Sequence, residues 1–191
     1  MLPISDADLL IRSATTADAA AIASIYGHWV SRGTSSFELV PPSLFEMRHR
    51  LDTLLAGGFP WLVAVRGGEI AGYAYAGPYR PRPAYRFTVE DSIYVAPAAT
   101  GGGIGRRLLA ALLDEATARG FRQMLAVMGD PANSGSARLH ESLGFRVVGT
   151  FERVGYKHGR WLDTLLMQRD LVPAPEPVAT DRPDQTPPSA R

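Results

Sequence analysis

The sequence predicts an α+β fold, in which a mixed central sheet is flanked by helices. Two observations support this prediction. Helical and strand patterns alternate along the chain in the order β-α-α-β-β-β-α-β-α-β-β. Consecutive strands in the middle of this order favour antiparallel hairpins, whereas helices between the later strands favour parallel crossovers. A single sheet that contains both kinds of connection is mixed.

The first part of the chain holds one strand followed by two helices. Residues 9–15 indicate a short strand, and the next helix is expected to begin with Thr16 as its N-cap. A second helix is expected from Ser43, which has Glu46 three residues later in a capping-box arrangement. Gly57 is a typical helix stop, so the second helix should end there.

The remaining elements alternate between strands and helices. Residues 61–77 indicate a hairpin that turns at Gly67 and Gly68. A strand follows over 85–97 and ends at Pro97. The later pattern predicts a helix at 104–120, a strand at 121–129, a short helix at 133–144 and two strands within 145–171.

The domain organisation is visible as a change in composition after Leu171. Six of the fifteen prolines fall within the last nineteen residues, which contain almost no apolar anchor. Such a segment buries too little surface to offset the entropy that is lost on ordering. We therefore expect a single domain over residues 1–171 and a disordered, proline-rich tail over 172–191.

Bulk composition narrows the functions that the chain can have. The net charge is +1, which argues against nucleic acid or an anionic membrane as a partner. The chain has no cysteine, which excludes a disulfide framework, a thiolate metal site and a cysteine nucleophile, and we expect no metal. It shows neither a signal-peptide pattern nor an apolar run long enough to span a membrane. A cytoplasmic location is the expectation.

The most informative segment is VAPAATGGGIGRRLLAALL, residues 95–113, in which four glycines lie between a strand and a helix. Without side chains, successive backbone N–H groups can converge on an anion, and the positive end of the helix dipole adds to the attraction. Arg106 and Arg107 suit a phosphate at this position. The segment matches neither the ATP-binding pattern G-x-x-x-x-G-K-S/T nor the dinucleotide pattern G-x-G-x-x-G, so another phosphate ligand is expected.

The loop resembles the signature of the GNAT superfamily of N-acetyltransferases, Gln/Arg-x-x-Gly-x-Gly/Ala, with Thr100, Gly103 and Gly105 at the matching positions. Thr100 is a departure that removes a side-chain contact and leaves the backbone cradle intact. Further segments, including TVE, HESLGF and G-x-K-H-G-x-W-x-D, make the chain similar to phosphinothricin and methionine sulfoximine N-acetyltransferases from about Ile11 to Leu171. This resemblance implies a GNAT-type acyl-CoA N-acyltransferase fold, with acetyl-CoA as co-substrate.

The same resemblance implies how acetyl-CoA would be held. The strand residues Ile93, Tyr94 and Val95 would pair with the pantetheine amides through their backbone. Asn133 matches a CoA-contacting asparagine of the family, although a plain helix N-cap would account for it equally well. Backbone N–H groups around the glycines would hold the pyrophosphate: Gly101, Gly102, Gly103, Ile104, Gly105 and Arg106.

A general base is needed because amines arrive protonated. Glu90 is the leading candidate, since strand alternation places it with Ser92 on the face opposite Val89, and TVE matches the family's catalytic glutamate. Asp91 falls on the apolar face, where a buried carboxylate needs a partner or a bulge that turns it toward the substrate. A solvated Glu–Asp pair is the alternative. His140 is a second candidate base, although a histidine beside leucines on a helix is more often a hydrogen-bonded packing residue.

Substrate recognition is expected in the proline-stiffened loop that contains Arg80, Pro81 and Arg82, because arginine binds carboxylates in a bidentate manner. Solvated loop arginines are the alternative. Asp91 and Ser92 are placed beside this site. The expected substrate is a small amine with a carboxylate, such as methionine sulfoximine, methionine sulfone or phosphinothricin.

Two other interpretations stay open from the sequence. One is a GNAT enzyme that acetylates another amine, such as a peptide N-terminus, a lysine or a polyamine; the other is a non-catalytic CoA-binding protein. The arginine-rich loop argues against a polyamine, and Glu90 argues against a loss of catalysis. The family commonly dimerises, so a homodimer is expected, to which the apolar strand 161–167 would contribute unless it is a core strand.

Overall fold

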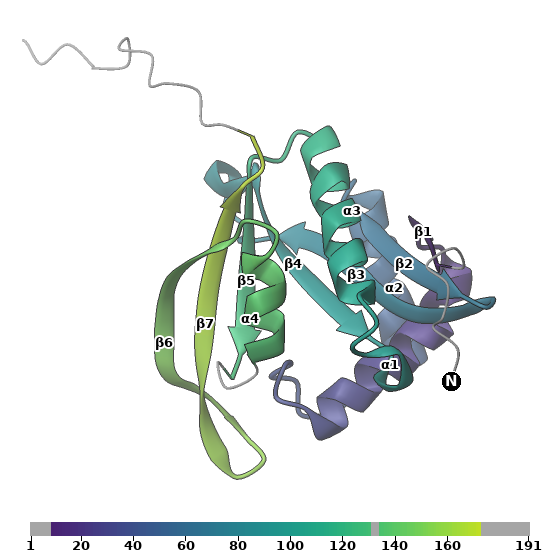
Figure 1. Ribbon diagram of the computed structural model, residues 1–191, viewed down its shortest axis with the longest axis horizontal. Helices are drawn as coiled ribbons and strands as arrows, with labels where there is room; N and C mark the ends of the chain where they lie inside the picture. Colours follow the sequence, from purple (N-terminus) through teal and green to yellow (C-terminus); the bar gives the residue numbers. More distant parts are fainter. Residues whose placement is uncertain (1–8, 131–133, 173–191) are drawn as a thin grey trace, which may run out of the picture.

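The computed structural model describes residues 9–130 and 134–172. These residues form seven strands and four α-helices in the predicted order, β-α-α-β-β-β-α-β-α-β-β (Figure 1). The strands are β1 (Leu9–Ser13), β2 (Trp61–Arg66), β3 (Glu69–Pro78), β4 (Thr88–Val95), β5 (Gln123–Gly129), β6 (Arg146–Lys157) and β7 (Arg160–Asp170). The helices are α1 (Ala19–Arg32), α2 (Leu44–Ala56), α3 (Ile104–Ala118) and α4 (Ser134–Glu141).

The seven strands form one mixed sheet in the order β1-β2-β3-β4-β5-β7-β6. β4 and β5 are parallel, and every other neighbouring pair among these strands is antiparallel. The parallel pair arises because α3 carries the chain from the end of β4 back to the beginning of β5. The prediction of a mixed sheet flanked by helices is therefore confirmed.

The helices divide the core into two apolar layers, one on each face of the sheet (Figure 1). On one face, Leu108, Leu109 and Leu112 of α3 are fully buried, and α4 packs beside them. On the other face, Ile22 of α1 and Leu51 of α2 are fully buried against an aromatic cluster from β2 and β3. Each face of the sheet therefore meets a different environment, which decides what alternate residues of one strand can do.

The structure confirms the predicted ends of α2 but not the predicted N-cap before α1. The Ser43 hydroxyl accepts a hydrogen bond from the Glu46 amide at 3.1 Å, and α2 ends at Gly57, as predicted. The prediction of Thr16 as an N-cap was wrong. Thr15 caps a short 3₁₀ turn that leads into α1, because the Asp18 carboxylate reaches back and accepts from the Thr15 amide at 2.8 Å.

The start of β4 also departs from the prediction. The strand expected from residue 85 begins only at Thr88, because the chain first forms a 3₁₀ turn at Pro83–Tyr85, where proline favours a turn. The predicted tail, 172–191, lies outside the described residues except for Val172. No helix within the described part of the chain is long and apolar enough to cross a membrane.

Candidate active site

The central feature of the site is a gap between the two parallel strands, β4 and β5. They pair only where residues 88–91 face residues 123–126, whereas β5 continues to pair with β7 up to Gly129. Beyond Asp91 the edge of β4 that faces β5 is open. Along a strand, the backbone N–H and C=O groups of successive residues point alternately to the two neighbouring strands. The Ala96 amide donates to the Ala71 carbonyl of β3. The backbone groups of Ile93 and Val95 therefore point the other way, toward the gap.

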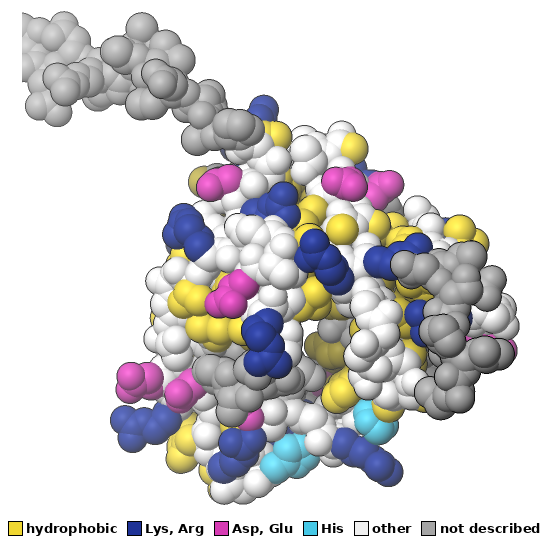
Figure 2. All heavy atoms as spheres, in the orientation of Figure 1, with side chains coloured by type: hydrophobic (Ala, Val, Ile, Leu, Met, Phe, Trp, Pro, Cys, Tyr) yellow, Lys and Arg dark blue, Asp and Glu magenta, His cyan; other side chains and the backbone are white. Residues whose placement is uncertain are grey.

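A groove of about 480 Å³ runs from this gap to the glycine-rich loop. Figure 2 shows the surface hollowed between α4 and the beginning of α3. The groove brings together most of the residues that were predicted to bind acetyl-CoA: Ile93, Tyr94, Val95, Gly101, Gly103, Ile104, Gly105 and Arg106. Gly102 does not line it, since a Cβ there would point toward the Arg66 guanidinium, 3.5 Å away. Asn133 lies outside the described residues.

Glycine is required in the loop for conformation and for space. Gly103, the N-cap of α3, has φ of 75°, in the left-handed region that other residues adopt only at a cost. A Cβ on Gly105 would lie 3.2 Å from Leu139 Cδ2 of α4. The first turn of α3 therefore approaches α4 closely, and its free N–H groups lie at the groove, where they suit the diphosphate of CoA.

A smaller cavity of about 60 Å³ lies at the base of the gap, lined in part by Asp91, Ser92 and His140. It continues the groove, because both are lined by Ser35, Ile93, Tyr94 and Ser136. The thioester end of acetyl-CoA would reach this base if its diphosphate lay at the glycine loop.

Asp91 and His140 form a buried pair at this point. His140 Nε2 lies 3.0 Å from Asp91 Oδ2, and the exposed fractions of the two residues are 3% and 6%. Of the two alternatives, a partner or a bulge, the structure has the partner: Asp91 lies on the apolar face and contacts His140. The pairing of β4 with β3 and β5 shows no register shift, so there is no bulge at Asp91. Its second oxygen, Oδ1, is buried and has no hydrogen-bond partner among the described residues.

The hydrogen bonds of His140 indicate its protonation. Nδ1 lies 2.8 Å from the carbonyl oxygen of Ser136, which can only accept, so Nδ1 carries a proton. A further proton must lie between Nε2 and the Asp91 carboxylate. Burial lowers the pKa of His140, but the charge and hydrogen bond of Asp91 and the Ser136 carbonyl raise it more, so the pKa is raised overall. The pair is best described as imidazolium and carboxylate.

Glu90 lies on the opposite face of the same strand. It pairs with Gly77 in the register of β3 and β4, and Ser92 pairs with Tyr75, so Glu90 and Ser92 face the side of the sheet that α1 and α2 cover. This confirms the predicted alternation. Glu90 is half-buried, and burial together with the charge of Asp91 raises its pKa. A raised pKa brings a carboxylate closer to the range in which it exchanges protons with an amine.

The loop that contains Arg80 and Arg82 lies at the same end of β3 and β4 as Glu90. It leaves β3 where Pro78 pairs with Val89, the neighbour of Glu90. Its residues Arg80, Pro81 and Arg82 are exposed and line a shallow pocket of about 240 Å³. Neither arginine has an acidic partner in the described ranges, and the Arg80 guanidinium lies 5.1 Å over the Tyr79 ring. Both guanidinium groups are therefore available to an anion.

Sequence reasoning missed some of the groove's walls. Trp29 of α1 lines the groove and donates from Nε1 to the Val95 carbonyl at 2.8 Å. Ser136 and Leu139 of α4 line it too. Spacing along the chain carries no signal for these contacts, since Trp29 and Val95 are 66 residues apart.

Comparison with known proteins agrees with this geometry. Residues 24–145 match the model of the Acetyltransferase (GNAT) family. The chain is 52% identical to phosphinothricin N-acetyltransferase of Alcaligenes faecalis over 81% of its own length and 78% of the relative's. It is 40% identical to L-methionine sulfoximine/L-methionine sulfone acetyltransferase of Pseudomonas aeruginosa, covering 85% and 95% of the two chains.

Solved structures show the same fold. The crystal structure of a GNAT superfamily phosphinothricin acetyltransferase from Sinorhizobium meliloti, in complex with acetyl-CoA, superposes with a TM-score of 0.85 at 45% identity. The match covers 93% of this chain and 97% of that one. The co-substrate of the family is acetyl-CoA, and the groove described above has the form to hold it. This chain belongs to the GNAT family of N-acetyltransferases.

Proposed function

We propose that this enzyme transfers the acetyl group of acetyl-CoA to the α-amino group of a small amino-acid analogue of the phosphinothricin, methionine sulfoximine or methionine sulfone type. The observation that carries the proposal is the position of Glu90, a half-buried carboxylate on β4 beside the point where β4 and β5 separate. The names of the relatives supply the substrate class.

The co-substrate would be held by backbone groups. Ile93 offers its N–H and C=O groups and Val95 its N–H group at the open edge of β4, as a neighbouring strand would use them, whereas the Val95 carbonyl already accepts from Trp29. The N–H groups of residues 101–106 would bind the diphosphate at the start of α3. Acetyl-CoA supplies an activated acyl group, so the protein contributes mainly position and charge.

Glu90 is the proposed base. It would accept the proton that the ammonium group must lose before its nitrogen can attack the thioester carbonyl. The C–N bond then forms and the C–S bond breaks. CoA leaves as a thiolate, a fair leaving group by its ordinary pKa, and this thiolate takes up the second proton, which the nitrogen releases as the amide forms. Asp91 and His140 lie on the other face of β4, where their buried ion pair would fix the base of the gap.

The arginines would bind the other end of the substrate. Arg80 and Arg82 would clamp the carboxylate of the amino acid, because a guanidinium group binds a carboxylate in a bidentate manner. Pro81 between them limits the freedom that the loop loses on binding. Ser92 faces the same side of the sheet as Glu90 and would contact the amino group.

The expectations of a homodimer and of a cytoplasmic location stay predictions. The dimer is supported by exposed apolar side chains on the edge strand β6 and its neighbour β7, namely Val147, Phe151, Val154, Tyr156 and Trp161. A second copy of the chain would remove this surface from water. Light scattering on the purified protein would give the mass of the assembly directly.

The function is tested by following thiol release from acetyl-CoA across a panel of amines. The panel holds methionine sulfone, methionine sulfoximine, phosphinothricin, ordinary amino acids, a polyamine and a lysine peptide. The protein contains no cysteine, so it adds no thiol background. Turnover with the amino-acid analogues supports the proposal, turnover confined to the peptide or polyamine overturns the substrate, and CoA binding without turnover indicates a non-catalytic protein.

A further inference from the structure

The beginning of α3 carries positive charge without an acidic residue on the helix to balance it. Gly103 caps the helix, and Arg106 and Arg107 lie in its first turn, which contains no acidic residue. The free N–H groups of this turn add the positive end of the helix dipole. Cations at this end of a helix are unfavourable unless an anion lies nearby. The arrangement therefore fits the phosphate groups of the co-substrate.

Arg66 adds a further cation at this loop from another part of the sheet. It is the last residue of β2 and lies opposite Leu9 in β1 and Glu69 in β3. A Cβ on Gly102 would lie 3.5 Å from Nη1 of Arg66 and 3.7 Å from Nη2. The end of the Arg66 side chain therefore lies against the loop. Gly102 has no positive φ, so its missing side chain provides room for the guanidinium group.

The guanidinium group of Arg66 has no protein partner in the described part of the chain. It makes neither a hydrogen bond nor an ion pair there, not even with the facing Glu69. The residue is half-buried, so part of its surrounding water is also lost. A charged group that gives up water without gaining a partner raises the free energy of the unliganded protein. A bound anion would supply the partner.

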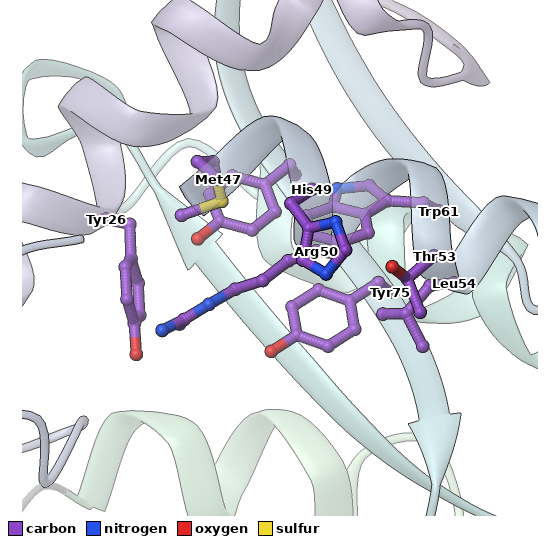
Figure 3. Close-up of a pocket in the computed structure, with 9 residues that line it drawn as sticks. Tyr26, Met47, His49, Arg50, Thr53, Leu54, Trp61 and Tyr75 are labelled. Carbon is purple, nitrogen blue, oxygen red and sulfur yellow. The ribbon is translucent and has the colours of Figure 1, made fainter. Parts of the chain in front are cut away.

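Arg50 is a half-buried arginine whose charge, by contrast, is met within the protein. It lines a cavity of about 250 Å³ beside Tyr75, between α1, α2, β2 and β3 (Figure 3). It donates to Glu38 at 2.6 Å and to Glu46 at 2.9 Å. Arg66 has no such carboxylates among the residues that the structure describes, so its charge is left for a ligand.

Two other polar side chains at the loop are already engaged. The Thr100 hydroxyl donates to the Pro97 carbonyl at 3.0 Å, which holds the turn before the glycines. Arg106 donates from Nη1 to the Ser142 carbonyl at 3.1 Å and to the Ser142 hydroxyl at 2.7 Å. A phosphate group at the loop would have to compete with these contacts for either side chain, whereas the N–H groups of Arg66 are available.

The position of Arg66 relative to the groove indicates which part of CoA it would meet. Gly101 and Gly103 line the groove and Gly102 does not, so the guanidinium group lies just outside the end of the groove. CoA has a diphosphate followed by a ribose that carries a 3′-phosphate. With the pantetheine in the groove and the diphosphate at the beginning of α3, the nucleotide leaves the groove at this loop. A guanidinium group binds a phosphate group through two N–H groups at once.

We propose that Arg66 binds a phosphate group of CoA, either the diphosphate or the 3′-phosphate, and thereby contributes to the affinity for acetyl-CoA. The chain has Thr100 where the family signature has glutamine or arginine, and Arg66 supplies a side-chain donor from β2 instead. The inference concerns the co-substrate and holds whichever amine is acetylated.

The test measures the dissociation constants of CoA and of dephospho-CoA, which lacks the 3′-phosphate, by calorimetry on the full-length protein. Arg66→Gln should weaken CoA binding by roughly tenfold, the effect of one lost charge-assisted hydrogen bond. A contact with the 3′-phosphate predicts that the wild type and the variant bind dephospho-CoA equally well. A contact with the diphosphate predicts the same loss for both ligands. Equal affinity of the wild type and the variant for CoA overturns the proposal.

Two further measurements separate a phosphate contact from a structural role of Arg66. The deficit of Arg66→Gln in CoA affinity should shrink as the salt concentration is raised, because salt screens charges near the surface. The unliganded variant should unfold at the wild-type temperature or above it, since the substitution removes no hydrogen bond or ion pair within the described ranges. A deficit that does not depend on salt, or that comes with a less stable unliganded protein, assigns Arg66 a structural role and overturns the proposal. Arg48→Gln, at an exposed position of α2, should match the wild type throughout.

Discussion

His140 Nε2 and Asp91 Oδ2 lie 3.0 Å apart in a buried contact that joins α4 to β4 where β4 and β5 separate. The pair holds its extra proton because the Ser136 carbonyl fixes Nδ1 as a donor and the Asp91 carboxylate faces Nε2. The pair therefore puts a buried titratable group at the base of the gap.

This pair predicts a specific dependence of stability on pH. The folded-state pKa of His140 is raised, so its contribution to the free energy of unfolding is fully present below the unfolded pKa, about 6.5. The contribution is lost as pH rises through the folded pKa. Urea unfolding between pH 6 and 9 should show a decline in the wild type that is weaker in His140→Gln. His49→Gln, which changes an exposed histidine, should keep the wild-type decline. Equal slopes in all three proteins would contradict the prediction.

The role of Glu90 predicts a selective loss of activity. Glu90→Gln keeps the shape of the side chain and removes the base, so kcat/KM should fall by about 10²- to 10⁴-fold. The affinity for CoA should not change, because Glu90 does not line the groove. Steady-state kinetics and calorimetric CoA binding measure the two effects separately. Glu69→Gln, at an exposed position of β3, is the matched control.

The raised pKa of Glu90 adds a second observable. The acid limb of the wild-type profile of kcat/KM against pH should lie above the ordinary glutamate pKa, about 4.3. In Glu90→Gln that limb should disappear from the residual activity. An unchanged limb would show that another group controls the reaction.

Phe37 lies in a socket made by two glycines from different strands. A Cβ on Gly155 of β6 would overlap the Phe37 ring, at 2.6 Å from Cδ2, and a Cβ on Gly129 of β5 would lie 2.5 Å from Cε1. Neither glycine has a positive φ, so the requirement is for space. The ring fastens the segment between α1 and α2 to the C-terminal half of the sheet.

Gly155→Ala should therefore destabilise the protein by about 1–3 kcal/mol, the usual effect of overpacking. Gly149→Ala in the same strand is the control, because no atom of the described residues lies within 4 Å of its added Cβ. Urea unfolding of both variants gives the difference. Phe37→Ala in the Gly155→Ala background should remove the clash, and purely additive effects in this double-mutant cycle would contradict the socket.

Local patterns were enough to predict the order of elements and much of the groove. Alternation along β4 placed Glu90 and Ser92 on one face and Asp91 on the other, because a strand has a fixed period of two. The glycines before α3 indicated the anion cradle, because only backbone without side chains can form it. Both inferences depend on residues that are close in sequence.

Contacts between distant residues could not be predicted in the same way. The partner of Asp91 is 49 residues away on α4, and the sequence was equally compatible with a bulge. The cavity beside Tyr75 depends on how α2 packs over β3, which periodicity does not specify. The sequence did not identify Thr15 as the cap, because this cap depends on a contact with Asp18. The Asp18 carboxylate accepts from the Thr15 amide and is held in place by Arg12.

Arg12 and Asp18 predict how acid weakens the N-terminal part of the fold. The Asp18 carboxylate accepts two hydrogen bonds from Arg12, at 2.7 and 2.8 Å, and these, with the Thr15 amide and against the opposing effect of burial, lower its pKa to about 2. A lowered folded-state pKa gives a stabilisation that is present above the unfolded pKa, about 3.9, and is lost as pH falls toward 2. Because the Arg12 side chain is 39% exposed, solvent screening reduces the contribution to about 1 kcal/mol.

Asp18→Asn should thus lower the free energy of unfolding at pH 7, and its deficit relative to the wild type should shrink between pH 4 and pH 2. The deficit shrinks because protonation removes the same charge from the wild type that the substitution removes permanently. Urea unfolding of the two proteins across this range measures the deficit. Asp114→Asn, at an exposed position of α3, should track the wild type throughout. A deficit that stays constant down to pH 2 would mean that Asp18 acts through its shape and hydrogen bonds to Thr15 instead of its charge.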